Sequence, residues 1–278
     1  MNQFGGNWTE RKMEIVVAYA KAYLTIMKEQ PWAKPIYFDG FAGSGIIETE
    51  EEEEVIKGTA LRILDIIEPS SFDLYYFVEL EENHRAELER RVQENYFGRN
   101  AHVVKADCND KLVKMAEFMS KNRNYRALAF IDPYGMSVNW SSIESLKGLG
   151  IDLWILVPTG IGVNRMLKTD GNISEPWYIK LEKFLGLSKD EIKRIFYREV
   201  SYQSLFGEEI THQIKEANSI NKIHHLYRER LKSVFKEVSE PFVLRNSTNS
   251  IMYHFMMATN NKTALKIAND IIKPKYKL

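Results

Sequence analysis

Hydrophobic and polar positions along the first 160 residues predict short buried strands that alternate with helices. Apolar side chains recur at the helical period over residues 11–28. The mostly apolar runs that predict buried strands are 35–39, 73–78, 101–106, 127–131 and 152–157. The helical stretches between them are 59–67, 81–95 and 110–119. This alternation is typical of an α/β fold with a mostly parallel sheet and helices on both faces.

The pattern changes after residue 160. Residues 175–237 look helical throughout, with breaks at 186–188 and 201–207. The two β-like runs and the closing helix that come last are 241–244, 251–258 and 262–272. The predicted organisation therefore has three parts, which are a sheet core at 1–160, a helical insertion at 161–238, and C-terminal strands with a helix that complete the core at 239–278.

The composition is that of a globular protein. The chain has 278 residues with 38 basic and 38 acidic side chains, and 44% of its residues are hydrophobic, whereas disordered chains combine low hydrophobicity with high net charge. The single cysteine, Cys108, excludes an intrachain disulfide and a multi-cysteine zinc site. No apolar run approaches the roughly 20 residues of a membrane span, and the first residues lack the features of a signal peptide. We expect a soluble, cytoplasmic protein without a metal centre.

Charge is distributed unevenly, although it sums to zero. Residues 180–278 carry 18 Lys and Arg against 11 Asp and Glu, and the rest of the chain is acidic. Part of that acidity is the glutamate run at 48–54, which is typical of a solvated loop. Aromatic side chains in the basic part either pack helices or stack on nucleic-acid bases. They are Phe184, Phe196, Tyr197, Tyr202, Phe206 and Tyr227. Zero net charge therefore leaves DNA or RNA open as a partner.

A glycine-rich turn follows the first predicted strand directly. It has the sequence Asp39-Gly40-Phe41-Ala42-Gly43-Ser44-Gly45. Glycines let a backbone turn tightly and approach a ligand without a clash of a Cβ atom. On its own, such a turn is as typical of a structural loop as of a binding site.

Each of the next three predicted strands ends in a carboxylate, and these are Glu79, Asp107 and Asp132. Ligands bind outside the carboxyl ends of the strands in open α/β sheets, so we expect the acids to converge on the glycine-rich turn. Glu79 lies further from Gly45 than the about 20 residues of dinucleotide-binding folds. This spacing disfavours a nicotinamide enzyme.

The sharpest motif is Asp132-Pro133-Tyr134-Gly135. The proline restrains Asp132 toward an extended conformation, which aims its carboxylate from a rigid strand end. Tyr134 offers an aromatic face beside that carboxylate. An Asp-Pro turn with a packed tyrosine would have the same pattern, and that interpretation stays open.

The ordered motifs resemble those of S-adenosyl-L-methionine-dependent methyltransferases, and more closely those of the three-Cys-motif partner (TcmP) family of bacteria. The segments that carry the resemblance are Trp8 with Lys12 ahead of the first helix, residues 37–43, residues 130–135 and residues 156–165, and the strand at 253–260 completes it. The resemblance implies a Rossmann-like class I methyltransferase fold with a seven-stranded sheet, a methyltransferase activity and S-adenosyl-L-methionine as the cofactor. A three-Cys-motif protein as partner follows from the family name only.

The resemblance also implies roles for individual residues. In such enzymes the glycine-rich motif holds the cofactor, the second strand's acid holds its ribose, the third strand's acid holds its adenine, and the fourth motif is catalytic. The cofactor-binding residues are then Asp39, Gly40, Phe41, Gly43, Ser44, Gly45, Glu79, Leu80, Asp107 and Cys108. The catalytic residues are Asp132, Pro133 and Tyr134.

The substrate stays open at this point. Asn164 and Arg165 follow the fifth strand and either line the substrate side of the cleft or form a turn with a salt bridge. The motif lacks the second proline of DNA amino-methyltransferases and is similar to the D-P-F-G of tRNA guanine-N2 methyltransferases. A base amino group of DNA or RNA is therefore the preferred substrate. The alternatives are a small molecule, a protein, or a non-catalytic subunit that binds a partner.

Two further features are interpreted as structural. Adjacent helical residues such as His224 and His225 point about 100° apart, and no suitably spaced acids accompany them. We expect them to be surface histidines. Cys108 has no activating base in its vicinity in the sequence, so we expect a packing role for its side chain.

Overall fold

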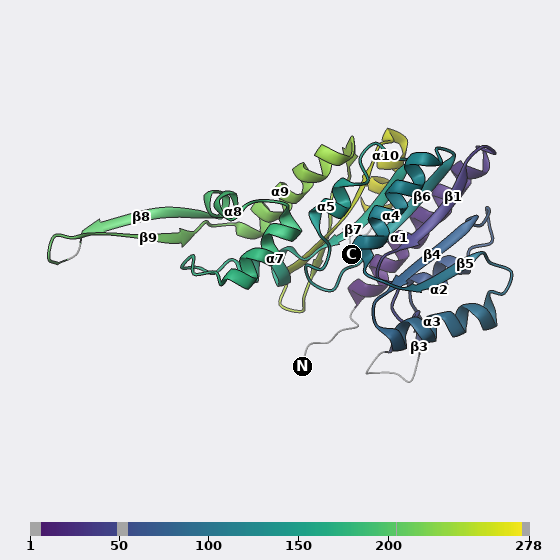
Figure 1. Ribbon diagram of the computed structural model, residues 1–278, viewed down its shortest axis with the longest axis horizontal. Helices are drawn as coiled ribbons and strands as arrows, with labels where there is room; N and C mark the ends of the chain where they lie inside the picture. The colour runs from purple at the N-terminus through teal and green to yellow at the C-terminus, as the bar shows by residue number, and fades with distance from the viewer. Residues whose placement is uncertain (1–6, 49–54, 204, 274–278) are drawn as a thin grey trace.

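A sheet runs through the middle of the molecule, and helices cover both of its faces (Figure 1). The computed structural model describes residues 7–48, 55–203 and 205–273. Within these ranges eight strands form the sheet, in the order β10-β12-β7-β6-β1-β4-β5, and β11 also pairs with β12. The strands are β1 (Lys34–Asp39), β4 (Leu74–Glu79), β5 (Ala101–Lys105), β6 (Tyr125–Ile131), β7 (Ile151–Val157), β10 (Glu237–Val238), β11 (Phe242–Arg245) and β12 (Ile251–Thr259).

Most neighbouring strands are parallel, as the sequence predicted. In the described part of the chain, β7, β6, β1, β4 and β5 run parallel, and β12 pairs antiparallel with β7. The predicted number of seven strands is wrong, because β10 and β11 pair with different parts of the same edge of β12. Val238 lies opposite Ala258, whereas Phe242 lies opposite Phe255. Two short strands therefore share one position in the sheet.

Helices follow the strands in the predicted alternation. In chain order they are α1 (Asn7–Lys28), α2 (Thr59–Leu64), α3 (Glu82–Asn95), α4 (Cys108–Lys121), α5 (Trp140–Glu144), the π-helix η1 (Thr159–Val163), α6 (Asn164–Met166), α7 (Glu175–Leu185), α8 (Lys189–Phe196), α9 (Ser219–Val234) and α10 (Lys262–Ile272). Trp8 and Lys12 lie inside α1 rather than ahead of it. The first turn of α1 has Trp8 as its one apolar residue, so the apolar period could show the helix only from residue 11 onward.

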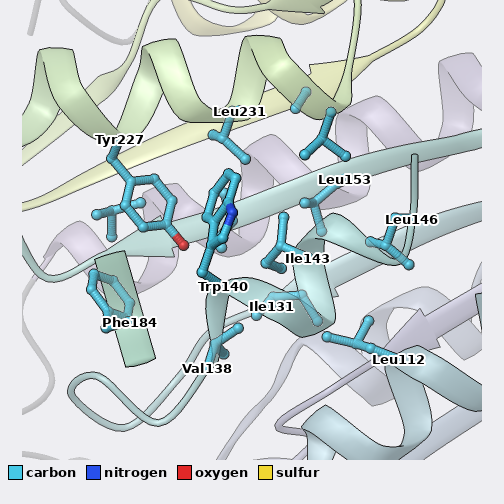
Figure 2. Packing of buried hydrophobic residues seen from close by; sticks show 14 of the residues in the cluster. Leu112, Ile131, Val138, Trp140, Ile143, Leu146, Leu153, Phe184, Tyr227 and Leu231 are labelled. Atoms are coloured by element: carbon cyan, nitrogen blue, oxygen red, sulfur yellow. The ribbon is translucent and has the colours of Figure 1, made fainter. Parts of the chain in front are cut away.

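The inserted segment shares a hydrophobic core with the sheet. Phe184 of α7 and Leu231 of α9 are fully buried in the same cluster as Leu153 of the sheet. Figure 2 shows Trp140 of α5 between these layers, with the ring of Tyr227 from α9 beside it. The two rings meet edge to face at a centroid distance of 5.8 Å. The aromatics at 184, 196, 197 and 227 are thus packing residues rather than a nucleic-acid face.

The insertion is not helical throughout, and this part of the prediction is wrong. Residues 197–215 form a hairpin, here called the arm, of β8 (Tyr197–Gln203) and β9 (Glu209–Lys215). The arm projects from the body of the molecule (Figure 1). β-branched and aromatic residues are frequent in both strands, which favours extended backbone. The short turn between the strands looked like a break between two helices.

A smaller hairpin leaves the sheet next to the glycine-rich turn. Its strands are β2 (Ile46–Glu48) and β3 (Val55–Lys57), which pair antiparallel. The predicted glutamate loop connects them, and residues 49–54 lie outside the described residues. Among the helices of the described ranges, none is long and apolar enough to cross a membrane.

Candidate functional site

The strand order reverses at β1, which lies between β4 and β6. After β1 the chain builds the sheet outward through β4 and β5, and it then returns to place β6 on the other side of β1. The carboxyl ends of these strands lie side by side at this switch point, which is where open α/β sheets bind ligands. The glycine-rich turn follows β1 there, and Glu79 and Asp132 stand at the ends of the two neighbouring strands.

The glycine-rich turn needs its glycines at identifiable positions. Gly43 and Gly45 have φ angles of +63° and +82°, which side chains rarely tolerate. A Cβ atom on Gly40 would lie 2.5 Å from Cys108 Sγ and 2.7 Å from Ile131 Cδ1. A Cβ atom on Gly43 would meet nothing within 4 Å. The turn therefore packs tightly against the strand ends at Gly40 and presents bare backbone to open space at Gly43.

Glu79 ties the turn to the neighbouring strand. Its side chain is buried, and its Oε2 accepts a hydrogen bond of 2.9 Å from the Gly43 amide. Its Oε1 accepts one of 2.9 Å from the Glu81 amide. Each carboxylate oxygen has two lone pairs, so Glu79 keeps acceptor capacity for a ligand hydroxyl. Leu80, the next residue, is exposed at the same strand end.

Asp39 supports the turn from below. It is buried, and its Oδ1 accepts a hydrogen bond of 3.1 Å from the Phe41 amide. The Tyr37 hydroxyl donates to its Oδ2 at 3.3 Å. Burial, with the charge of Asp132 as a smaller cause, raises the pKa of Asp39 to about 7. These bonds make Asp39 a support of the glycine-rich turn.

Asp132 forms an ion pair that sequence reasoning missed. The ammonium group of Lys12, on α1, donates to Oδ2 of Asp132 across 120 positions of the chain. Lys12 is buried and Asp132 is half-buried. A sequence signal existed, because Lys12 continues the apolar stripe of Val16 and Tyr19 and must therefore face the core. A buried ammonium needs a partner, and a carboxylate at a strand end supplies it.

Tyr134 is 74% exposed, so the interpretation as a packed tyrosine is wrong. Its loop is tied to the start of α4 through Asn109. The side-chain Nδ2 of Asn109 donates to the Ser137 carbonyl at 2.9 Å, and its side-chain Oδ1 accepts from the backbone amide of Asn139 at 2.7 Å. Asp107 caps α4 and accepts from the Asn109 amide at 2.7 Å. Asn109 thus joins the third and fourth predicted motifs, and nothing in the sequence pattern singled it out.

Cys108 packs beneath the glycine-rich turn, as the sequence predicted. Its side chain is buried, and burial raises the pKa of its thiol. A protonated, enclosed thiol is a poor nucleophile. Over the described residues, no group of three or more His, Cys, Asp or Glu side chains could hold a metal ion.

The chain beyond β7 continues from the carboxyl end of the strand that pairs with β6. The π-helix η1 begins at Thr159, and Asn164 and Arg165 follow it in α6. Asn164 is half-buried and Arg165 is exposed. A Cβ atom on Gly160 would collide with the backbone carbonyl of Ile251, so a glycine lets η1 lie directly on β12.

His224 is buried, so the expectation of a surface histidine is wrong for this residue. Its ring stacks on that of His254 at a centroid distance of 4.4 Å, with an angle of 9° between the planes. His254 Nδ1 lies 2.8 Å from the Thr159 hydroxyl. Burial lowers the pKa of His224 to about 4 and that of His254 to about 3. The neutral pair therefore packs α9 against β12 and the start of η1.

No protein-family model and no curated protein matches the sequence. Solved structures give distant similarities. Protein LPL1258 from Legionella pneumophila is 14% identical, with 93% of this chain and 99% of that chain covered and a TM-score of 0.45. Trm1 from Pyrococcus horikoshii, in a complex with S-adenosyl-L-methionine, is 9% identical, with 96% and 72% covered and a TM-score of 0.41. An S-adenosylmethionine-dependent methyltransferase from Clostridium acetobutylicum is 8% identical, with 88% and 92% covered and a TM-score of 0.38.

The fold class follows from the strand order of the chain itself. The described sheet has its first parallel strand in the middle, the second and third on one side and the fourth and fifth on the other. The antiparallel β12 then lies between the fifth strand and the short edge strands. This arrangement confirms the predicted Rossmann-like class I methyltransferase fold.

Proposed function

We propose that the chain is an S-adenosyl-L-methionine-dependent methyltransferase that modifies an amino group of a nucleic-acid base. The observation that carries this proposal is the hydrogen bond between the Gly43 amide and Glu79 at the switch point of the sheet. It joins a glycine-rich turn to a carboxylate with spare acceptor capacity, next to the strand that ends in Asp132. The quoted motifs also support membership of the three-Cys-motif partner family as part of the proposal.

The residues present fit the proposed cofactor. Bare backbone at Gly43, where a Cβ atom would meet only open space, is suited to the methionine end of the ligand. Glu79 would hold the ribose hydroxyls, because its oxygens can each accept a second hydrogen bond. Asp107, which is exposed at the start of α4, would accept from the adenine amino group. Leu80 would give the adenine an apolar neighbour.

The cofactor, when bound, supplies an activated methyl group, and the protein supplies binding and orientation. The lone pair of an exocyclic amine is delocalised into the base, which makes the amine a poor nucleophile. Asp132, with the Pro133 carbonyl, would accept hydrogen bonds from that amine and localise its lone pair. Tyr134 is exposed beside Asp132 and would stack on the base. A target in a duplex would have to be flipped out, at a cost of a few kcal/mol.

A specific observation favours a second candidate, a non-catalytic subunit with the same fold. The ion pair with Lys12 engages the carboxylate that catalysis would need. In a methyltransferase, one oxygen of Asp132 would have to accept from the substrate while Lys12 holds the other. In a non-catalytic subunit, the pair would only hold α1 against the end of β6.

The first experiment that tests the proposal measures binding of S-adenosyl-L-methionine to the protein by calorimetry and by thermal shift. Transfer of labelled methyl groups to total DNA, RNA or protein then separates the substrate classes. Asp132→Asn should abolish transfer and leave cofactor affinity unchanged, since the asparagine oxygen can still accept from Lys12. Absence of cofactor binding by the wild-type protein would overturn the proposal, and loss of binding in Asp132→Asn would contradict the role of Asp132.

A further inference from the structure

The tip of the arm exposes large apolar side chains. Phe206 is 92% exposed and Leu205 is fully exposed in the turn between β8 and β9. Tyr202 and Ile210, on the two strands nearest the turn, are exposed as well. A two-stranded hairpin is marginally stable in water on its own, and clustered exposed apolar groups mark interaction sites. The tip has the character of a contact surface.

The root of the arm is fixed to the body, which gives the tip a defined direction. The Tyr197 hydroxyl donates to the Lys168 carbonyl at 2.8 Å. Lys215 Nζ donates to the carbonyls of Asn164 and Leu167 at 2.8 and 2.7 Å. These bonds attach the arm to the segment after β7, at the carboxyl end of the sheet.

The charge of the outer part of the arm, residues 199–214, does not suit a polyanion as its partner. Residues 199–214 contain no Lys or Arg and three acidic residues, which are Glu199, Glu208 and Glu209. Phosphate-binding surfaces are rich in Lys and Arg. An acidic, apolar tip instead fits an apolar hollow with a basic rim.

The body of the molecule carries such a hollow at the opposite end of the sheet. A cavity of about 380 Å³ lies where β6 and β7 begin, and its lining includes Arg123, Arg126, Lys236 and the apolar Leu149. No carboxylate is among the described residues that line it. Beside it, the guanidinium group of Arg126 lies over the ring of Trp32, with its Cζ atom 4.5 Å from the ring centroid, and Trp32 is 52% exposed. Tryptophan and arginine are the residues that dominate binding energy in protein interfaces.

We propose that this hollow receives the arm tip of a second copy of the chain. The arm of one molecule starts from the carboxyl ends of its strands and projects away from the body (Figure 1), so it is directed away from its own hollow at the amino ends. Phe206 fills the hollow of the partner, and Glu208 and Glu209 face its basic rim. A two-fold arrangement lets each copy donate one arm and accept the other, which closes the assembly as a dimer.

Sedimentation velocity over a range of concentrations tests the proposal. The wild-type chain should dimerise, and Phe206→Glu should weaken the dimer at least tenfold, since it places a charge in the apolar contact. The matched control is Phe97→Glu, because Phe97 is 95% exposed on another part of the surface and should leave the dimer unchanged. A wild-type chain that stays monomeric, or a dimer that tolerates Phe206→Glu, would overturn the proposal.

Charge reversal identifies the other half of the contact. Arg123→Glu with Lys236→Glu should weaken the dimer, and so should Glu208→Lys with Glu209→Lys. Mixing the two double variants should restore both arm-to-hollow contacts of a mixed dimer, because each arm then meets a hollow of the opposite charge. A mixture that stays monomeric, while each variant keeps the thermal stability of the wild-type chain, would contradict this pairing of surfaces.

Discussion

Glu79 holds the glycine-rich turn and is also proposed to bind the cofactor. A substitution of this residue should therefore affect both the stability of the protein and its affinity for the cofactor. Glu79→Gln replaces one acceptor by an NH₂ group that faces the Gly43 or Glu81 amide. Loss of a hydrogen bond to a charged group should cost about 2 kcal/mol of unfolding free energy. Cofactor affinity should fall roughly tenfold or more, as 1.4 kcal/mol corresponds to a factor of ten. Urea unfolding and calorimetry measure the two effects.

The control for that substitution is Glu81→Gln. Glu81 is exposed and caps α3, where its side chain accepts from the His84 amide. This change should have little effect on stability, because the glutamine oxygen can still accept from the His84 amide, and it should leave cofactor affinity unchanged. An equal loss of affinity in both variants would show that Glu79 acts only through the stability of the strand end.

Lys12 and Asp132 can be tested as a pair. Lys12→Met removes the ammonium and leaves a half-buried carboxylate near Asp39. Breaking such a pair should destabilise the fold by about 3 kcal/mol. The double variant Lys12→Met with Asp132→Asn should recover most of that loss, since no uncompensated charge remains. A double-mutant cycle from urea unfolding measures the coupling, and additive effects would contradict a direct ion pair.

Residues that follow apolar runs could be predicted, and residues that meet across the fold could not. Glu79 and Asp132 were placed correctly at strand ends because a carboxylate after a buried strand is visible in the sequence. The partnership of Lys12 with Asp132 depends on how α1 lies on the sheet, which no local pattern contains. Asn109 is hidden in the same way, because its partners lie in a loop about 30 residues away.

At the scale of elements, the contact between α9 and β12 makes stability depend on pH. The folded pKa values of His224 and His254, about 4 and about 3, lie below the ordinary 6.5. Below pH 6.5 the unfolded chain therefore binds more protons, and stability falls as the pH decreases toward 4. Each histidine contributes a slope of up to about 1.4 kcal/mol per pH unit. Asp39 contributes to the pH dependence with the opposite sign. Its pKa is raised in the folded state, so its contribution to stability decreases as the pH rises toward 7.

Variants isolate the histidine contribution, because Asp39 contributes equally to all of them. His254→Gln keeps a polar group near the Thr159 hydroxyl and removes one titrating ring. Its unfolding free energy should lose about half of the histidine slope between pH 6.5 and 4.5 (roughly the interval between the two states' pKa values). His102→Gln, at an exposed histidine, should keep the wild-type slope. Identical slopes in all three proteins would refute the assignment.

The arm shows why element type was mistaken in one segment. Apolar and polar residues alternate only over short runs in the sequence at 197–215, and runs of that length are compatible with both a helix and a strand. In the sheet core, flanking turns and buried apolar runs resolved the ambiguity. The arm has neither, because it leaves the body and buries only its root, so its hairpin could not be inferred from a hydrophobic period.

At the scale of the whole molecule, the basic surplus of residues 180–278 should attract a polyanion less strongly than the number of Lys and Arg residues suggests. Described basic side chains of this part pair with nearby carboxylates, as in Lys189–Glu175, Arg228–Glu240 and Lys232–Glu229. The outer part of the arm, residues 199–214, holds three of the 11 acidic residues of this part and no Lys or Arg. Any nucleic-acid contact should therefore fall on the chain beyond β7, where Arg165 of α6 is exposed, rather than along the arm.

This placement can be measured through the salt dependence of binding. Arg165→Glu should weaken binding of a short single-stranded RNA and lower the slope of log affinity against log salt by about 1. A variant in which residues 199–213 are replaced by a Gly-Gly turn removes no Lys or Arg, so its slope should match that of the wild-type chain. Fluorescence anisotropy over a salt series measures both. A slope that decreased on loss of the arm but not in Arg165→Glu would place the polyanion on the arm, contrary to its charge.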